Sequence, residues 1–267
     1  MTEAASVCAL VLAGSRRGED DPVARYRQLP WKCLVTVGGV PMLTRVVRAL
    51  VACPRIGTVF VSLDDAEQLD LLPELAELRA GGRIRTLTSA GSLSRSVADA
   101  FAQSGAPLLV TTADHALLSP AMLEHFLTTA DAAGADVAAG LASEAVIGAA
   151  YPATRRTYLR FRGGAYSGAN LFALRTLAAA DAIAFWARIE RDRKRPWRLA
   201  RAFGPGLLLA YLLRLCTLDQ AMALASRRLG LRAVAVQIPI AEAAIDVDKP
   251  ADLDLVEEIV ARREHAA

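Results

Sequence analysis

The stretch Val7-Cys-Ala-Leu-Val-Leu-Ala-Gly-Ser-Arg-Arg-Gly18, with Lys32 beyond it, decides the fold of this chain. Its apolar run from Ala9 to Ala13 stops at Gly14, which is the pattern of a fully buried strand in a parallel sheet. The following loop suits an anion, because glycines allow close backbone approach and serine and arginine side chains donate hydrogen bonds. Ligands of open α/β sheets bind beyond the carboxyl ends of the strands. The sequence therefore predicts a phosphate site here; the alternative is an ordinary strand-to-loop connection with solvated arginines.

Length and composition fit one large α/β domain or two small ones. The chain has 267 residues, 54% of them hydrophobic, which is ample for a core. Its formal net charge of +3 is too small to indicate a nucleic-acid partner. The four cysteines are scattered with no C-x-x-C pair, so we expect a reduced, cytoplasmic setting. The N-terminus has no basic region typical of a secretory signal.

Strand and helix patterns alternate along most of the chain. After the first strand we expect a short strand beginning at Lys32 and further strands over 58–63, 83–89, 107–114, 136–141, 146–151, 157–161, 167–174 and 231–238. Helices are expected over 41–53, 66–79, 91–102, 119–134 and from about 250 to the C-terminus. This order predicts a single domain over residues 1–267, with a doubly wound, mostly parallel sheet in a three-layer α/β/α arrangement.

Residues 178–230 depart from this alternation and predict a basic helical insertion. The segment 188–201 contains seven cationic residues and only two acids. Within it or close to it in the sequence are Trp186, Trp197, Phe203 and the apolar run 207–213. This composition suits peripheral contact of 185–215 with an anionic membrane face. The alternative is a helical subdomain that covers the active site or forms a dimer, so the oligomeric state stays open. The apolar run is far too short to span a bilayer.

One lysine and several aspartates lie beside predicted apolar strands or the last helix, where their charges need a partner or a structural role. Asp114 ends an apolar strand, where it is poorly solvated unless paired with a cation, and Mg²⁺ favours one or two carboxylates plus substrate oxygens. Asp246 and Asp248 precede the last helix, whose first turn Asp252 is expected to serve. Lys32 lies between Trp31 and Cys33, where a buried ammonium needs an anion. The alternatives are a helix-capping aspartate and an exposed strand-edge lysine.

Five motifs, taken in order and spacing, resemble the nucleotidyltransferase superfamily, and most closely its branch of molybdenum-cofactor guanylyl- and cytidylyltransferases, the MobA-like NTP transferases. The motifs are Val11-Leu-Ala-Gly-Ser-Arg-Arg-Gly18, Lys32, Gly39-Val-Pro-Met-Leu43, Thr111-Thr-Ala-Asp114 and Ile245-Asp-Val-Asp-Lys-Pro-Ala-Asp-Leu253. The resemblance covers about residues 7–175 and 231–260. The first loop departs from the family pattern, because it lacks the second glycine and is two residues shorter.

The resemblance implies a Mg²⁺-dependent reaction in which a phosphate of an acceptor attacks the α-phosphorus of CTP or GTP and pyrophosphate leaves. Such catalysis positions two anions and offsets the charge that grows on the transferring group. By resemblance, Lys32, Arg16 and Arg17 would contact the phosphates. Asp114 would bind the metal, with the second ligand supplied by Asp246 or Asp248.

The remaining site residues are also implied by the resemblance. The nucleotide-binding residues would be Leu12, Ala13, Gly14, Ser15 and Gly18 in the first loop and Ser94 and Arg95 at the base and sugar. For the segment 91–96 the alternative is a helix N-terminus with a serine cap. Asn170 would contact the acceptor, a phosphorylated small molecule such as a precursor of a lipid head group or cofactor.

Two other functions remain open on the sequence. A glycosyltransferase of related fold would typically carry Asp-x-Asp at the metal strand, whereas Asp114-His-Ala lacks the second acid. A non-catalytic, membrane-associated binding module could keep the fold without Lys32 or Asp114, yet both are present. Because fold alone does not separate these functions, the site residues must.

Overall fold

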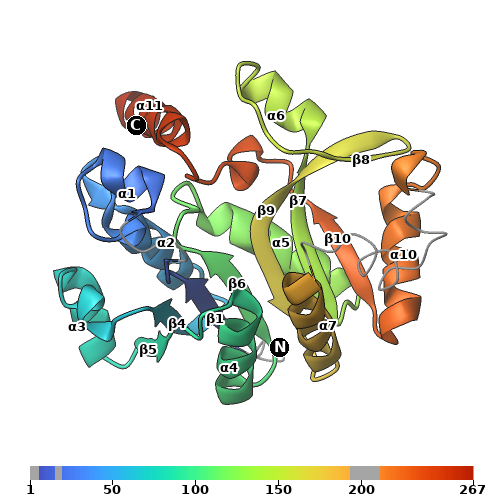
Figure 1. Cartoon of the computed structure of the whole chain (residues 1–267), viewed down its shortest axis with the longest axis horizontal. Helices are drawn as coiled ribbons and strands as arrows, with labels where there is room; N and C mark the ends of the chain where they lie inside the picture. Colours follow the sequence, from blue (N-terminus) through green and yellow to red (C-terminus); the bar gives the residue numbers. More distant parts are fainter. Residues whose placement is uncertain (1–5, 16–19, 193–210, 267) are drawn as a thin grey trace.

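A mixed β-sheet forms the middle layer of the molecule (Figure 1). The computed structural model describes residues 6–15, 20–192 and 211–266, and within them eight strands form one sheet in the order β10-β7-β9-β6-β1-β4-β5, with β8 paired to β9. The strands are β1 Val7–Leu12, β4 Ile56–Leu63, β5 Ile84–Thr88, β6 Leu108–Thr112, β7 Val137–Ser143, β8 Leu159–Phe161, β9 Gly164–Leu174 and β10 Ala233–Gln237. Only the pairs made by β9 are antiparallel among these described strands. The doubly wound, mostly parallel sheet that the sequence predicts is therefore confirmed.

Helices cover both faces of this sheet. They are α1 Pro22–Tyr26, α2 Met42–Val51, α3 Pro73–Ala80, α4 Leu93–Ser104, α5 Pro120–Ala132, α6 Glu144–Ala150, α7 Ala179–Asp192, α10 Leu218–Leu229 and α11 Pro250–Ala266. Short 3-10 turns lie at Lys32–Leu34, Ala66–Leu69 and Ala241–Ala244, and β2 Thr36–Val37 pairs with β3 Val40–Pro41 in a separate ribbon.

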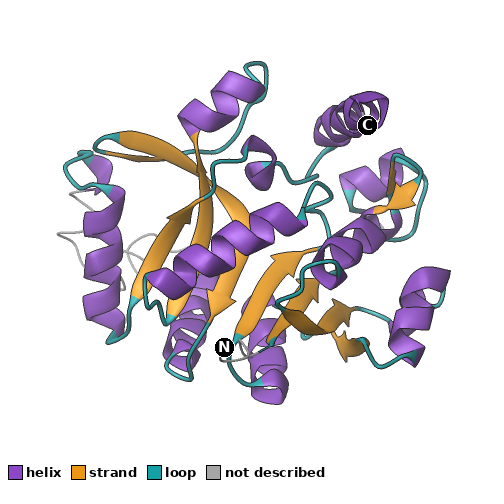
Figure 2. Cartoon of the chain, turned by 180° about the vertical axis from the view of Figure 1, so that it is seen from behind, coloured by secondary structure: helices purple, strands orange, loops and turns teal. Residues whose placement is uncertain are grey.

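The central strand β1 is buried on both faces, which explains its continuous apolar run. Ala9 and Val11 belong to the cluster that includes α2 and α5, the helices in front of the strands when the molecule is seen from behind (Figure 2). Leu10 and Leu12 belong to the cluster that includes α4 and α7 on the opposite face (Figure 1). Alternate side chains of one strand thus pack into two helical layers, as the pleat requires.

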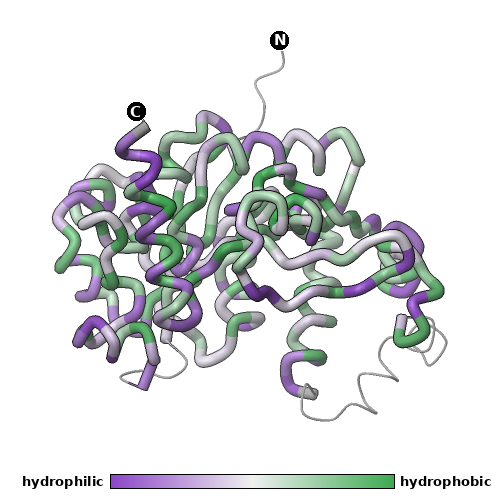
Figure 3. The backbone as a smooth tube through the Cα atoms, turned by 90° about the horizontal axis from the view of Figure 1, so that it is seen from above, coloured by the Kyte–Doolittle hydropathy of each residue, from purple (hydrophilic) through white to green (hydrophobic). Residues whose placement is uncertain are grey.

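A separate apolar cluster fixes the segment that precedes α11. Ile245 and Val247 are fully buried against residues of α11 such as Val256, and they alternate with Asp246 and Asp248, which line a pocket. Figure 3 shows that hydrophobic and hydrophilic residues are interspersed along α11, the C-terminal helix. Two buried anchors therefore hold two acids at fixed positions.

Three local expectations were wrong. The predicted strand at 146–151 is the helix α6, because Ser143 accepts a hydrogen bond from the Val146 backbone N–H and caps it. Lys32 begins a 3-10 turn, not a strand. The predicted helix at 66–79 is divided into a 3-10 turn and α3, since Pro73 favours the first turn of a helix over its interior.

The predicted basic insertion is described at its two ends. It begins with α7 and finishes with α10, which a capping box of Thr217 and Gln220 opens, whereas 193–210 lies outside the described residues. Among the described helices, none combines the length and the apolar composition that a bilayer-spanning segment needs.

Candidate active site

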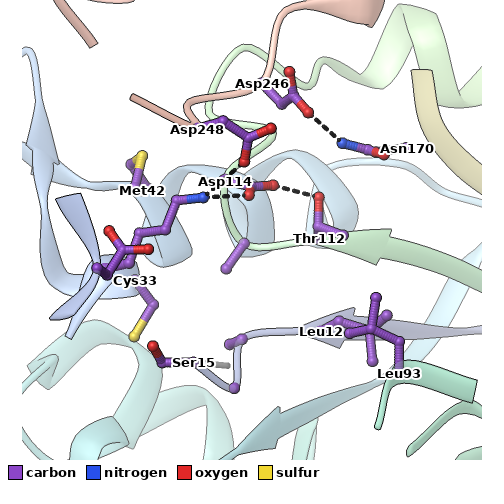
Figure 4. Close-up of a pocket in the computed structure, with 15 residues that line it drawn as sticks. Leu12, Ser15, Cys33, Met42, Leu93, Thr112, Asp114, Asn170, Asp246 and Asp248 are labelled. Carbon is purple, nitrogen blue, oxygen red and sulfur yellow. Dashed lines mark hydrogen bonds and ion pairs between the residues drawn. The ribbon is translucent and has the colours of Figure 1, made fainter. Parts of the chain in front are cut away.

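A pocket of about 490 Å³ lies beyond the carboxyl ends of β1 and β6 (Figure 4). This volume is within the range of small-molecule sites, and the place is where open α/β sheets bind ligands. Its described lining combines the first loop, the end of β6 and the segment before α11: Leu12, Ala13, Gly14, Ser15, Asp21, Lys32, Cys33, Met42, Leu93, Thr112, Ala113, Asp114, Asn170, Asp246 and Asp248.

The Lys32 ammonium joins two distant carboxylates in this pocket. Its Nζ lies 2.6 Å from Oδ2 of Asp114 and 3.2 Å from Oδ1 of Asp248. Burial alone would lower the pKa of Lys32, but the charges of Asp114, Asp248 and Asp21 outweigh burial and the net shift is upward. The side chain therefore stays cationic at neutral pH.

Asp114 is held by its neighbours in the fold. Thr112, at the end of β6, donates its hydroxyl to Oδ1 of Asp114 at 2.5 Å. The Val247 N–H donates to the Asp114 carbonyl at 3.1 Å, which ties the segment before α11 to this strand end. Asp252 is buried and accepts the N–H groups of Asp248 and Lys249, each at 3.2 Å, so it serves the start of α11 as the sequence predicts.

Asp246 lies at the far end of the pocket and has its own partners. Arg156 donates to Oδ1 of Asp246 at 2.8 Å, and Asn170 donates to Oδ2 at 3.0 Å. Burial raises the pKa of Asp246, the charges of Asp248 and Asp114 raise it further, and Arg156 opposes the shift. Sequence reasoning missed Arg156, because two adjacent arginines in an irregular loop carry no pattern that distinguishes one of them.

A β-bulge lies beside Asn170, whose side chain binds the Asp246 carboxylate. The pairing of β7 with β9 shifts register between Ala139 and Leu141, and Asn170 has a positive φ of 47°. Gly140 lies at the shift, where an added Cβ would come within 3.2 Å of the Leu171 Cβ. Bulges re-aim side chains next to active sites, and a non-glycine residue with positive φ needs support from its surroundings.

The first loop approaches its neighbours closely. An added Cβ on Gly14 would lie 2.5 Å from the Ser89 Oγ and 2.9 Å from Oδ1 of Asp64. The Ser15 N–H donates to Oδ2 of Asp64 at 2.6 Å. A side pocket of about 50 Å³ opens here, lined in part by the hydroxyl-bearing Ser15, Ser62, Ser89, Ser92 and Ser96. The space left by Ser89 and Asp64 therefore favours glycine at position 14.

The other residues predicted to bind the nucleotide are not among the described lining residues of either pocket. Ser94 is buried and donates its hydroxyl to Glu190 at 2.5 Å, and Arg95 is exposed. Neither belongs to the described lining, whereas their neighbours Ser92 and Leu93 do. Arg16, Arg17 and Gly18 lie outside the described residues.

The carboxylates of the pocket fit a metal ion that substrate oxygens would also coordinate. Over the described ranges, no three acidic, histidine or cysteine side chains converge well enough to hold a metal ion by themselves. Two carboxylates, those of Asp114 and Asp248, lie close together because both bind the Lys32 ammonium. Mg²⁺ characteristically takes one or two carboxylates together with substrate phosphates, so this pair fits Mg²⁺.

His115 takes no evident part in this chemistry. Its side chain is fully buried, and neither ring nitrogen has a hydrogen-bond partner in the described structure. Burial lowers its pKa to about 4, against the opposing charge of Asp114. The ring is therefore neutral at physiological pH and supplies no charge to a phosphate.

Comparison with known proteins now assigns the family. The MobA-like NTP transferase domain matches residues 9–180, which carry β1, the first loop, Lys32 and Asp114. The chain belongs to the MobA-like NTP transferase family. It is therefore a nucleotidyltransferase, as the resemblance of its motifs predicts, and nucleotidyl transfer is favoured over the glycosyltransferase and non-catalytic alternatives.

Solved structures share this fold. A structure described as a hypothetical transferase from Thermus thermophilus is 30% identical, with a TM-score of 0.78 over 93% of this chain and 99% of that one. A CMP:2-keto-3-deoxy-manno-octonic acid synthetase complexed with CTP is 16% identical, with a TM-score of 0.56 over 97% of this chain and 100% of its own. A 4-diphosphocytidyl-2C-methyl-D-erythritol synthase from Anaerococcus prevotii is 10% identical, with a TM-score of 0.58 over 97% of each chain. The last two show the fold alone. No curated protein matches the sequence.

Replacement Gly14→Ala tests the close approach of the first loop. The new Cβ must displace Ser89 or Asp64 and with it the Ser15 N–H, so we expect affinity for fluorescent analogues of MgCTP and MgGTP to fall about tenfold or more. Gly148→Ala in α6, where an added Cβ meets nothing within 4 Å, is the matched control and should bind like wild type. Equal affinity of the two variants would contradict the role of Gly14.

Proposed function

We propose that this protein transfers a nucleoside monophosphate from CTP or GTP to a phosphorylated small molecule, with Mg²⁺ and with release of pyrophosphate. The observation that carries the proposal is the convergence of Lys32, Asp114 and Asp248 at one point of the pocket. These residues come from three separated segments, and charged side chains that converge in a partly buried pocket are characteristic of a functional site.

The charge of the pocket supports a metal-assisted reaction. Among the described lining residues Asp21, Asp114, Asp246 and Asp248 are acids, and Lys32 is the cation. A triphosphate would be repelled by this set unless further positive charge came with it. We propose that Asp114 and Asp248 hold Mg²⁺ and that Arg16 and Arg17 lie at the β- and γ-phosphates.

The roles of the residues follow from their positions. When bound, Mg²⁺ supplies positive charge that offsets the charge developing at the α-phosphate. Lys32, kept protonated by its acidic neighbours, would exchange one of its carboxylate partners for a phosphate oxygen. Thr112 keeps the Asp114 carboxylate aimed at the pocket through the hydrogen bond to Oδ1. The reaction forms a bond from an acceptor phosphate oxygen to the α-phosphorus and breaks the bond to the pyrophosphate, which leaves.

The two ends of the pocket suggest where the two substrates lie. Figure 4 shows Ser15, Leu12 and Leu93 at one end, Asn170 and Asp246 at the other, and Asp114, the partner of Lys32, between them. We place the nucleoside at the first end, beside the serine-lined side pocket, and the acceptor at the second end. Asn170 and Asp246 then act as hydrogen-bonding groups for the acceptor. A substrate at each end would bring the attacking phosphate and the α-phosphorus together beside Lys32.

Variant Asp114→Asn tests this assignment. It keeps the size of the side chain and a carbonyl for the Thr112 hydroxyl but removes the charge, so we expect turnover to fall about 100-fold or more. The measurement is pyrophosphate release with each nucleoside triphosphate and Mg²⁺ over a panel of phosphorylated acceptors, repeated after chelation and after Mg²⁺ is restored. Asp219→Asn, an exposed acid in the first turn of α10, is the control and should keep wild-type turnover. An Asp114→Asn enzyme with full activity would refute the proposed metal ligand.

A peripheral membrane contact is a second, separable part of the proposal. Leu212, Leu213 and Leu215, which precede α10, are 66%, 58% and 60% exposed. Arg188 and Arg191 are exposed on α7. Exposed leucines and exposed arginines are the groups that an anionic lipid surface binds, so we propose that residues 185–215 contact one. An acceptor on the way to a lipid head group would then be met at the membrane.

Co-sedimentation with vesicles tests this contact. We expect binding to vesicles of phosphatidylglycerol and phosphatidylcholine at low salt, weaker binding at high salt, and about tenfold weaker binding for the double variant Leu212→Ser, Leu213→Ser. Leu177→Ser is the control, because Leu177 is 74% exposed but lies just before α7. Wild-type protein that stays in the supernatant at low salt would overturn the membrane contact and leave the proposed reaction standing.

A further inference from the structure

Glu190, near the end of α7, reaches the first turn of α4. Its carboxylate accepts hydrogen bonds from the backbone N–H of Leu93 at 3.4 Å, from that of Ser94 at 3.1 Å and from the Ser94 hydroxyl at 2.5 Å. Ser94 is almost fully buried beneath this contact. An acid of the helical insertion thus forms hydrogen bonds with α4, a helix that packs on the central sheet.

Packing along α7 brings Glu190 to this position. Ile183 and Trp186 lie on the same face, at helical spacing from Glu190, and they pack into the cluster that contains Val97 and Phe101 of α4. Figure 1 shows α4 and α7 next to each other on the same side of the sheet. The apolar part of this face fixes the helix pair, and the carboxylate at its end meets the positive end of α4.

Glu190 completes the hydrogen bonds at the start of α4. Ser92 accepts the Arg95 N–H at 3.3 Å, and Ser96 accepts the Ala90 N–H at 3.0 Å. With Leu93 and Ser94 bound to Glu190, the N–H groups of the first three residues of α4 all have acceptors within the protein. These N–H groups are therefore committed to shaping the turn and do not await a phosphate.

This turn forms a wall of the pocket at the end where the nucleoside is placed. Gly91, Ser92, Leu93 and Ser96 line the side pocket, and Leu93 also lines the main pocket. Lys32 and Asp114 line only the main pocket. A group that fixes residues 91–96 therefore acts on the nucleoside end and leaves the phosphate end to Lys32 and the acids.

We infer that Glu190 is a positioning residue for the nucleoside: by holding the start of α4 it sets the shape of the wall formed by residues 91–96. The inference rests on the proposed function, because it assigns the nucleoside to this end of the pocket. It also gives the helical insertion a direct connection to substrate binding, since α7 is the first helix of the insertion and Glu190 is close to its end.

The experiment compares two ligands on the full-length protein. Glu190→Ala should weaken binding of fluorescent analogues of MgCTP and MgGTP about tenfold, since charge-assisted hydrogen bonds to the wall are lost, while binding of magnesium tripolyphosphate stays within about twofold of wild type. Glu190→Gln retains an acceptor oxygen without the charge, so its affinity for the nucleotide analogues should lie between those of wild type and Glu190→Ala. Asp181→Asn, an exposed acid in the first turn of the same helix, is the control and should bind both ligands like wild type.

Hydrogen exchange of the peptide spanning residues 91–96 gives a readout that needs no ligand. Exchange at Leu93 and Ser94 should accelerate in Glu190→Ala and less so in Glu190→Gln, with the rest of α4 protected as in wild type. If Glu190→Ala does not fold, Glu190→Gln carries the comparison. Wild-type protein that binds tripolyphosphate and the nucleotides, with no selective loss in either Glu190 variant, would overturn this inference alone. Wild-type protein that binds none of these ligands would overturn the proposed function and this inference with it.

Discussion

The structure depends on one electrostatic constraint, the sharing of the Lys32 ammonium by the carboxylates of Asp114 and Asp248. These three charges lie together in a partly buried pocket because the ammonium offsets both carboxylates, and removing Lys32 would leave two like charges close together. The bond from the Val247 N–H to the Asp114 carbonyl ties the segment before α11 to the end of β6, and the bonds that Asp252 accepts fix the backbone at Asp248 and Lys249. The arrangement is therefore built by the backbone as well as by the charges.

The fold explains why these groups meet. β1 is buried on both faces and lies between β6 and β4, so the loop after β1 and the end of β6 open at the same edge of the sheet. The segment before α11 reaches that edge because Ile245 and Val247 are anchored in an apolar cluster. Since side chains alternate along an extended segment, Asp246 and Asp248 both point into the pocket, and their different partners separate their environments.

Patterns of local origin predicted most of the architecture, and contacts between distant segments account for what was missed. The apolar run of β1 and the helix predicted from residue 119, which is α5, are encoded by neighbouring residues, and the structure has both. Lys32, Asp114, Asp246 and Asp248 could be proposed together only through the resemblance to a family. The bonds of Arg156 to Asp246 and of Glu190 to α4 join residues 90 and 96 positions apart, which no local pattern encodes. The helix α6 was missed because its few apolar residues fit either period.

The measurement that tests the central claim most directly is a double-mutant cycle on the two proposed metal ligands. Binding of Mn²⁺ in the presence of CTP and of GTP would be followed by electron paramagnetic resonance in wild type, Asp114→Asn, Asp248→Asn and the double variant. If both carboxylates hold one ion on one triphosphate, each single variant loses most of the affinity, and the double variant deviates from additivity by more than about 0.5 kcal/mol. Fully additive losses, or wild-type affinity in either single variant, would contradict the account.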